Sequence, residues 1–303
     1  MTCNNHVASH RPVVNPMGLV ACGPSSSQTM IVKTQCHATT TSRLNALMKS
    51  TYPSRPDAAA VVVSWVVGLL LISNILVNRV LPHWSYVPWN LAVAATVVVL
   101  ARRGRTDAEM GLARWRRGAL LGGTIAAGVL VVYAVAAAIP ATCDVFSDER
   151  VGEGWPLLVY HSLIRIPLGT VVLEELAFRA VVPALFTPPT SACHADHARS
   201  GRFRMTERVP AGVVRGVVVA SLLFGLWHVL PAWNVSDVNP LVADVFGDDG
   251  VGQAMGVVMA VLGTFVAGLT LCVLRYWSGS VLAPILVHGA TNSFGYAFAW
   301  SIG

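Results

Sequence analysis

The sequence predicts an all-α protein, a polytopic transmembrane helix bundle of about seven spans, with six to eight allowed. Three observations predict it: the composition, the spacing of the apolar segments and the alternation of charge between them. Of 303 residues, 54% are hydrophobic and 12% are charged. Soluble domains average about 25% charged residues. A chain with so few charges cannot cover itself with a polar surface, so we expect it in a membrane.

Seven apolar segments follow one another along the chain, and most reach the roughly 20 residues needed to cross the hydrocarbon core. They cover residues 58–78, 87–101, 118–139, 157–186, 212–233, 252–274 and 280–300. The second segment is short. The fourth is long and contains Pro167. Because proline removes a helix hydrogen bond, we expect this segment to divide into an interfacial piece and a span that starts near Leu168.

The chain divides into two parts by composition. Residues 1–56 are rich in Ser, Thr and Asn and lack hydrophobic periodicity, so we expect a disordered cytoplasmic N-terminal tail. Residues 57–303 are expected to form the transmembrane helical domain. Met48 lies shortly before the first span and is a candidate for the start of the native chain.

Arginine-rich connections alternate with arginine-poor ones, which predicts the orientation. The connections after the second and fourth segments carry ten arginines: Arg102, Arg103, Arg105, Arg114, Arg116, Arg117, Arg199, Arg202, Arg204 and Arg208. The connection after the fifth carries no Lys or Arg and contains four aspartates. By the positive-inside rule, the N-terminus is cytoplasmic and the protein is a multi-pass protein of the plasma membrane. Arginine clusters next to apolar spans are typical of cytoplasmic loops, so nucleic acid is not an expected partner.

Ionisable side chains inside apolar segments are costly, and each is therefore a candidate functional residue. Glu175 and Arg179 stand four apart in the fourth segment, so one helix face can hold them as an ion pair. Glu174 points about 100° away from Glu175 and is free to face a cavity. A glutamate held in this way can serve as a general base. The alternative is a purely structural Glu–Arg lock between helices.

Two further polar pairs have helical spacing, Phe224 with His228 and His288 with Asn292. A lone histidine on an apolar helix often serves only as a hydrogen-bonding packing residue. His288 and Asn292 project from one face and could bind a metal or donate hydrogen bonds to one oxygen. Measured from the cytoplasmic helix ends, Glu174, His228, His288 and Asn292 lie roughly 14–20 Å deep at the helix rise of 1.5 Å per residue. This common depth predicts a single polar cluster near the middle of the membrane.

At these residues the chain resembles the CPBP (CAAX protease and bacteriocin-processing) family of intramembrane proteases, also called the Abi family. The three motifs occur in the family's order, Glu174-Glu175-Leu-Ala-Phe-Arg179, Phe224-Gly-Leu-Trp-His228 and His288-Gly-Ala-Thr-Asn292. The resemblance extends over about residues 110–300. It implies a helical bundle with an intramembrane cavity and an endopeptidase activity.

The resemblance also implies roles for the individual residues. Glu174 and His228 would activate water, and His288 and Asn292 would stabilise the oxyanion. Glu175 belongs to the same catalytic set, and Arg179 and Phe224 would support it. Glu174, His228 and His288 also have the donor atoms of a zinc site, whereas a metal-free glutamate mechanism fits the same residues. Both mechanisms stay open from the sequence.

The substrate is expected to be a membrane-associated protein or peptide in the lipid bilayer. The chain has only two lysines, Lys33 and Lys49, among its 21 basic residues, which is typical of a GC-rich bacterial genome where prenylated CAAX proteins are not expected. Peptide maturation and bacteriocin self-protection are candidate processes. The alternative function is a non-enzymatic membrane protein, a transporter or scaffold, because transporters also place charges at the midplane.

Overall fold

The computed structural model describes residues 56–302 apart from 141, 147–150, 152–153, 188–208, 236–238 and 248. Residues 1–55 of the predicted tail therefore lie outside the described residues. So do Cys193, His194 and His197, whose spacing is weakly suggestive of metal binding and for which we expect a solvated loop.

Every apolar segment predicted from the sequence corresponds to a helix, and the described residues contain no strand. The fourth segment is built from five consecutive helical pieces, α5 (Trp155–Tyr160), η3 (His161–Val171), α6 (Val172–Glu175), η4 (Leu176–Val181) and α7 (Val182–Phe186). The other long helices are α2 (Pro56–Arg79), α3 (Tyr86–Arg102), α4 (Trp115–Ala138), α9 (Ala211–Trp227), α12 (Gly250–Ser278) and α13 (Leu282–Ile302). Short helices are η1 (His83–Ser85), η2 (Cys143–Phe146) and α11 (Pro240–Phe246). The structure confirms the predicted all-α membrane bundle.

Five helical stretches of the described chain are long and apolar enough to cross a membrane. They are Ala60–Arg79, His83–Arg102, Trp115–Ala138, Trp155–Phe186 and Gly250–Ser278. Helix α9 is apolar but has only 17 residues. The span count of seven stays a prediction.

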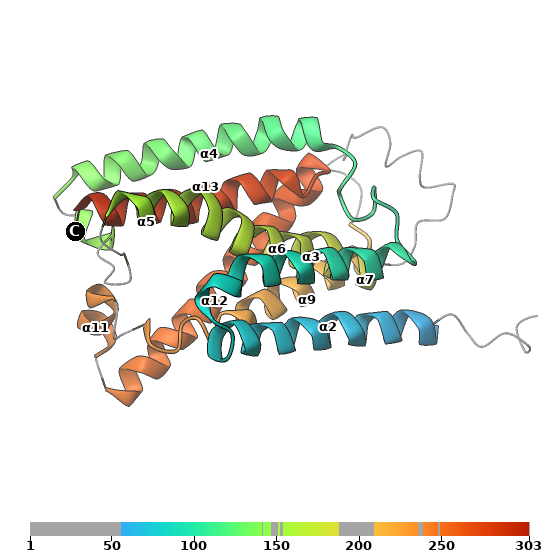
Figure 1. Cartoon of the computed structure of the whole chain (residues 1–303). Helices are drawn as coiled ribbons and strands as arrows, with labels where there is room; N and C mark the ends of the chain where they lie inside the picture. The colour runs from blue at the N-terminus through green and yellow to red at the C-terminus, as the bar shows by residue number, and fades with distance from the viewer. Residues whose placement is uncertain are drawn as a thin grey trace, which may run out of the picture. The chain divides into compact units, whose positions relative to one another are not determined.

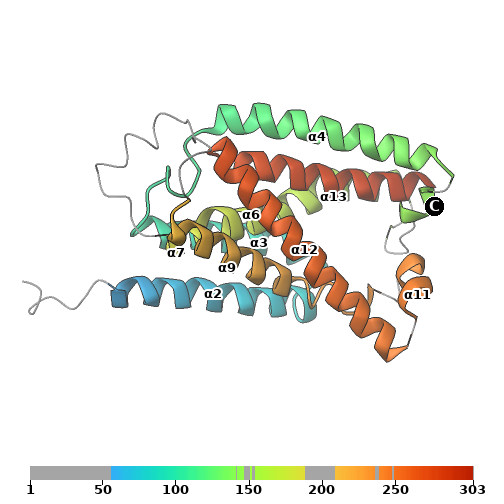
Figure 2. The ribbon, with the colours of Figure 1, turned by 180° about the vertical axis from the view of Figure 1, so that it is seen from behind.

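The long helices run back and forth along the bundle (Figure 1). Helices α4 and α13 lie side by side on one side of it, α2 lies on the opposite side, and α3, α6, α7 and α9 lie between, as both views agree (Figures 1 and 2). Helix α12 crosses the bundle obliquely. Small residues permit the close packing of α4 on α13, because a Cβ on Gly122 would lie 2.8 Å from the Ala283 backbone.

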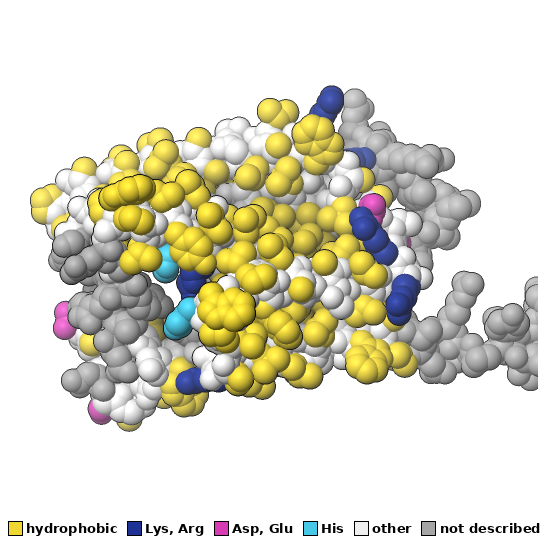
Figure 3. All heavy atoms as spheres, in the orientation of Figure 1, with side chains coloured by type: hydrophobic (Ala, Val, Ile, Leu, Met, Phe, Trp, Pro, Cys, Tyr) yellow, Lys and Arg dark blue, Asp and Glu magenta, His cyan; other side chains and the backbone are white. Residues whose placement is uncertain are grey.

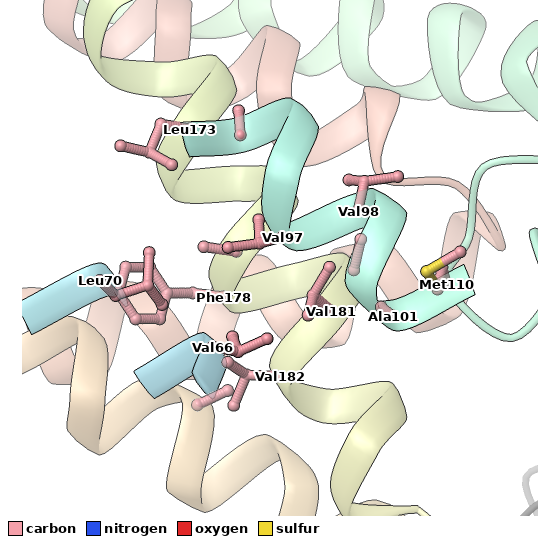
Figure 4. Close-up of a cluster of buried hydrophobic side chains, with 14 of the residues drawn as sticks. Val66, Leu70, Val97, Val98, Ala101, Met110, Leu173, Phe178, Val181 and Val182 are labelled. Atoms are coloured by element: carbon pink, nitrogen blue, oxygen red, sulfur yellow. The ribbon is translucent and has the colours of Figure 1, made fainter. Parts of the chain in front are cut away.

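The core joins α2 and α3 to the fourth helical stretch (Figure 4). Val66 and Leu70 of α2 and Val97 of α3 meet the buried ring of Phe178 and its neighbours. Their burial holds α6 and η4 in the middle of the bundle with apolar contacts on the α2 and α3 side. The polar side chains of this stretch are directed toward α9 and α13, as the contacts below show.

The expected break at Pro167 is wrong, because Trp155–Phe186 forms one continuous 32-residue helical stretch. Pro167 lies inside η3, which has π-helical hydrogen bonding. The Val172 N–H donates to the Pro167 carbonyl five residues earlier. A wider π turn accommodates the proline ring and its missing N–H without ending the helix, and such turns are frequent at functional sites.

The fifth segment is shorter than predicted, since α9 ends at Trp227 and not near residue 233. His228 is the residue that follows the helix, and its N–H bonds to the Gly225 carbonyl in a tight final turn. The sequence expected His228 to lie within a helix. As the residue that caps the helix, His228 keeps backbone angles in the right-handed helical region.

Candidate active site

Three ionisable residues of the fourth helical stretch are almost completely buried in the middle of the bundle. Glu174, Glu175 and Arg179 are 4%, 0% and 1% exposed. Arg179 Nε lies 3.2 Å from Glu175 Oε2, so the structure contains the ion pair that the spacing of four predicted. The guanidinium also lies over the Phe224 ring at 3.8 Å. This cation–π contact gives the buried charge a second partner on α9.

Glu175 is joined to α13 through a chain of polar contacts. His288 Nδ1 donates to Glu175 Oε1 at 2.8 Å. His288 Nε2 lies 3.0 Å from Asn292 Nδ2, which is one helical turn further along α13. A neutral imidazole with its proton on Nδ1 satisfies both contacts. A continuous series of polar contacts therefore runs from η4 to α13, through Arg179, Glu175, His288 and Asn292.

Glu174 is held at one oxygen and has a free second oxygen. Its Oε1 accepts a hydrogen bond from Trp227 Nε1 at 3.0 Å. Its Oε2 has no hydrogen-bond partner among the described residues and lies 3.8 Å from His288 Nε2. A carboxylate oxygen beside an imidazole, oriented by a bond on its other oxygen, is an arrangement suited to accept a proton.

Trp227 is the site residue that sequence reasoning missed. It lies in the Phe224-Gly-Leu-Trp-His228 motif, but a tryptophan in an apolar segment is ordinarily interpreted as packing. Its ring packs edge-on against Phe178 at 5.7 Å, and its backbone carbonyl accepts from the Asn74 amide of α2 at 3.0 Å. The available signal was the indole N–H, which usually finds an acceptor when buried.

His228 is the predicted residue that the structure does not bring against Glu174. No ion pair within 4.0 Å joins the two among the described residues, and His228 Nδ1 lies 2.8 Å from the Phe224 carbonyl. Because a carbonyl only accepts, Nδ1 carries the proton and Nε2 is left as an acceptor. The centroid of the Phe224 ring lies 4.7 Å from that of the His228 ring and 6.0 Å from that of the His288 ring. Phe224 therefore packs against both imidazoles.

The three residues considered as zinc ligands do not converge in this arrangement. Zinc sites place three protein ligands each about 2.0–2.2 Å from one ion. In the part of the chain that the structure describes, no three His, Cys, Asp or Glu side chains are grouped in a way that could hold a metal. His228 is directed toward its own helix, and His288 is engaged at both ring nitrogens. We therefore derive no step through a metal.

Side chains of α3 and α13 hold the π-helical stretch η3 just before the two glutamates. The Asn90 amide donates to the Gly169 carbonyl at 2.6 Å, and the Tyr86 hydroxyl lies 3.0 Å from the Thr170 hydroxyl. Ser293 donates to the Ser162 carbonyl at 2.8 Å. These bonds satisfy η3 groups and align the helix that carries the glutamates.

The fold and the site together define a polytopic membrane protein with a buried glutamate–histidine–asparagine cluster between helices. A family model described as "Type II CAAX prenyl endopeptidase Rce1-like" matches residues 155–294, a range that contains all three motifs. This match confirms the resemblance to the CAAX protease and bacteriocin-processing family and supports a CAAX-type intramembrane endopeptidase as the general class. No curated protein and no solved structure matches the chain.

Proposed function

We propose that the chain is an intramembrane endopeptidase that hydrolyses a peptide bond of a membrane-associated protein or peptide, with Glu174 as the general base. The observation that carries this proposal is the state of the Glu174 carboxylate. Trp227 orients one oxygen, and the other is buried, unpaired among the described residues and beside His288. Glu175 differs from Glu174 in that it is tied to both Arg179 and His288, as expected of a structural lock.

In the proposed reaction, a water molecule lies against Glu174 Oε2. The carboxylate takes a proton from this water while the water oxygen attacks the carbonyl carbon of the scissile bond. The carbonyl oxygen then becomes an oxyanion. The protonated glutamate then gives that proton to the leaving nitrogen as the C–N bond breaks. The products are a carboxylic acid and an amine, and Glu174 returns to its starting charge.

Asn292 is proposed to stabilise the oxyanion, and His288 is proposed to hold the Asn292 amide in place, because both of its ring nitrogens are already engaged. An amide NH₂ group has two donors, and the Asn292 group uses one on His288 Nε2 and keeps one for the substrate oxygen. Donors that are already oriented contribute most, because they need no reorganisation as charge develops. Glu175 and Arg179 position this pair through the His288 Nδ1 bond.

His228 is proposed to act on the substrate and not on Glu174. With its proton on Nδ1, its Nε2 can accept a hydrogen bond from the substrate backbone N–H. The resulting contact would hold the peptide in register beside the two glutamates. This assignment replaces the water-activating role that the family resemblance implied.

The proposed mechanism uses these side chains without a metal. The purified protein is then expected to retain its cleavage rate after dialysis against a chelator. The opposite result has two parts: the chelator removes a stoichiometric metal and the activity from wild type, and His288→Ala lacks both. That result would show that the protein forms a set of metal ligands which this arrangement lacks.

For the membrane, we propose the plasma membrane with the N-terminus in the cytoplasm. Support comes from the arginine-rich connections, which join the ends of α3 and α4 and of α7 and α9 on one side of the bundle. Reporter fusions after α2 and after α3 test the orientation. A cytoplasmic signal only after α3 agrees with it, and the opposite pattern contradicts it.

The function is tested by incubating the purified full chain with the membrane peptidome of its host and identifying new termini by mass spectrometry. Wild type is expected to produce new termini that Glu174→Gln does not produce, with His228→Ala producing fewer. Cleavage at the wild-type rate in both variants contradicts the assignment of the site.

A further inference from the structure

A second polar site lies away from the glutamates, at the turn that joins α2 to α3. A cavity of about 130 Å³ opens there between α2, α3 and η3. Its polar lining consists of Asn78, His83, Tyr86 and Arg165, and no Asp or Glu contributes to it. Figure 3 shows histidine and basic side chains together in a hollow of this otherwise apolar face.

Arg165 is the charged group of this cavity and has no anionic partner. Its guanidinium stacks on the Tyr86 ring, with the central carbon 4.4 Å from the ring centroid. No hydrogen bond or ion pair occupies its N–H groups in the part of the chain that the structure describes. Stacking uses the face of the guanidinium and leaves its edge, which carries the N–H groups, available to a bidentate anion.

The orientation of Tyr86 is fixed from the other side. Its hydroxyl bonds to Thr170, and a Cβ on Gly169 would come within 2.9 Å of its ring, so the ring lies directly on η3. The platform under Arg165 is therefore rigid. Neither glutamate lines the cavity, and none of the site residues of α9 and α13 does so.

The surroundings of the cavity are those of a membrane interface. Val80 and Trp84, on the α2–α3 turn, are 66% and 78% exposed. Tryptophan is enriched at the level of lipid headgroups. An arginine inside a span extends toward that level to meet water or phosphate. At that level of a membrane the available anions are the phosphates of lipid headgroups.

We propose that the Arg165 cavity binds the phosphodiester group of a membrane phospholipid, with Arg165 as the anion ligand and His83 as a second polar contact. At about 10–15 Å³ of such space per water molecule, the cavity of about 130 Å³ has room for roughly ten water-sized atoms, which is enough for the phosphorus and the oxygens of a phosphodiester. An anionic headgroup is preferred over a choline headgroup, because the lining has no carboxylate to pair with the choline cation. The proposal does not depend on the endopeptidase activity.

The test measures lipid binding to the purified full chain in detergent. The probes are short-chain phosphatidylglycerol, short-chain phosphatidylcholine, inorganic phosphate and an acylated peptide with a free carboxylate. Wild type is expected to bind phosphatidylglycerol most tightly. Arg165→Gln is expected to weaken that binding by about tenfold or more, the effect of losing one charge-assisted pair. Arg79→Gln is the matched control, since Arg79 is an exposed arginine at the end of α2 that does not line the cavity.

Each of the other outcomes overturns the proposal. Equal phosphatidylglycerol binding by wild type and Arg165→Gln means that Arg165 is not the ligand. If inorganic phosphate displaces phosphatidylglycerol at an equal concentration, the cavity is a site for a free anion. If the protein binds the acylated peptide more tightly than phosphatidylglycerol, the cavity is a substrate site. If Arg165→Gln does not fold, Arg165→Lys decides, because it keeps the charge and must keep the preference for phosphatidylglycerol over phosphatidylcholine.

Discussion

Replacing Trp227 by phenylalanine removes one hydrogen bond from Glu174 and little else. The substitution keeps an aromatic ring against Phe178 and leaves the backbone carbonyl that binds Asn74. It deletes the indole N–H that lies 3.0 Å from Glu174 Oε1. Glu174 is 4% exposed, and the phenylalanine ring has no N–H to take the place of the lost donor.

The size of the effect follows from the type of bond. A hydrogen bond to a charged group contributes about 1.5–3 kcal/mol. If this bond orients the base in the transition state, its loss lowers kcat by roughly ten- to a hundredfold at 1.36 kcal/mol per factor of ten. The KM changes little, because Trp227 is proposed to act on the base and not on the substrate.

A matched control exists in the same protein. The Trp89 indole donates to Ser73 at 2.9 Å, between α3 and α2 and away from the glutamates. Trp89→Phe loses a neutral bond of similar geometry, so it is expected to cost about 1 kcal/mol of stability and leave kcat near wild type. Both variants are assayed with a peptide substrate from the membrane peptidome, and their thermal unfolding is followed in parallel. A Trp227→Phe protein that keeps kcat within twofold, or a Trp89→Phe protein that loses as much kcat, refutes the reasoning.

Three further substitutions test the packing and the site. Arg179→Met leaves a buried carboxylate without its counter-ion and is expected to cost about 3–5 kcal/mol of stability. The control Arg102→Gln breaks an exposed ion pair and is expected to cost about 1 kcal/mol or less. Equal shifts of the two denaturation midpoints would contradict this expectation. Gly122→Ala is expected to lower the unfolding temperature, while Gly123→Ala, where a Cβ meets nothing within 4 Å, is expected to leave it unchanged or raise it. Asn292→Ala is expected to lower kcat about a hundredfold with little change in KM, and an unchanged kcat would remove it from the oxyanion site.

The sequence predicted the bundle well because the membrane imposes strong constraints. Apolar length determines where helices form, and each predicted segment is a helix in the structure. Local pairs were also predictable, since the spacing of four between Glu175 and Arg179 leads directly to contact on a helix. The contact between His288 and Asn292 follows from the same spacing.

The sequence predictions were wrong where non-local packing or an unusual backbone geometry determines the structure. Pro167 was expected to end a helix, but a π turn accommodates it. The fifth segment was expected to be helical to about residue 233, but α9 ends at Trp227, and His228 is the residue that follows it. Spacing along one helix says nothing about which residue of a neighbouring helix faces the site. For that reason the Trp227–Glu174 bond could not be read from the sequence.

The most direct test of the central claim is the rate of peptide cleavage by Glu174→Gln. The variant keeps the shape of the side chain and removes its ability to take a proton. The account predicts a loss of about 10²–10⁴-fold in kcat, the usual contribution of a general base, while the control Asp107→Asn, at an exposed carboxylate, retains wild-type activity. Cleavage by Glu174→Gln within a few-fold of wild type contradicts the account. So does a solute flux that depends on Glu174 in a protein that cleaves no peptide.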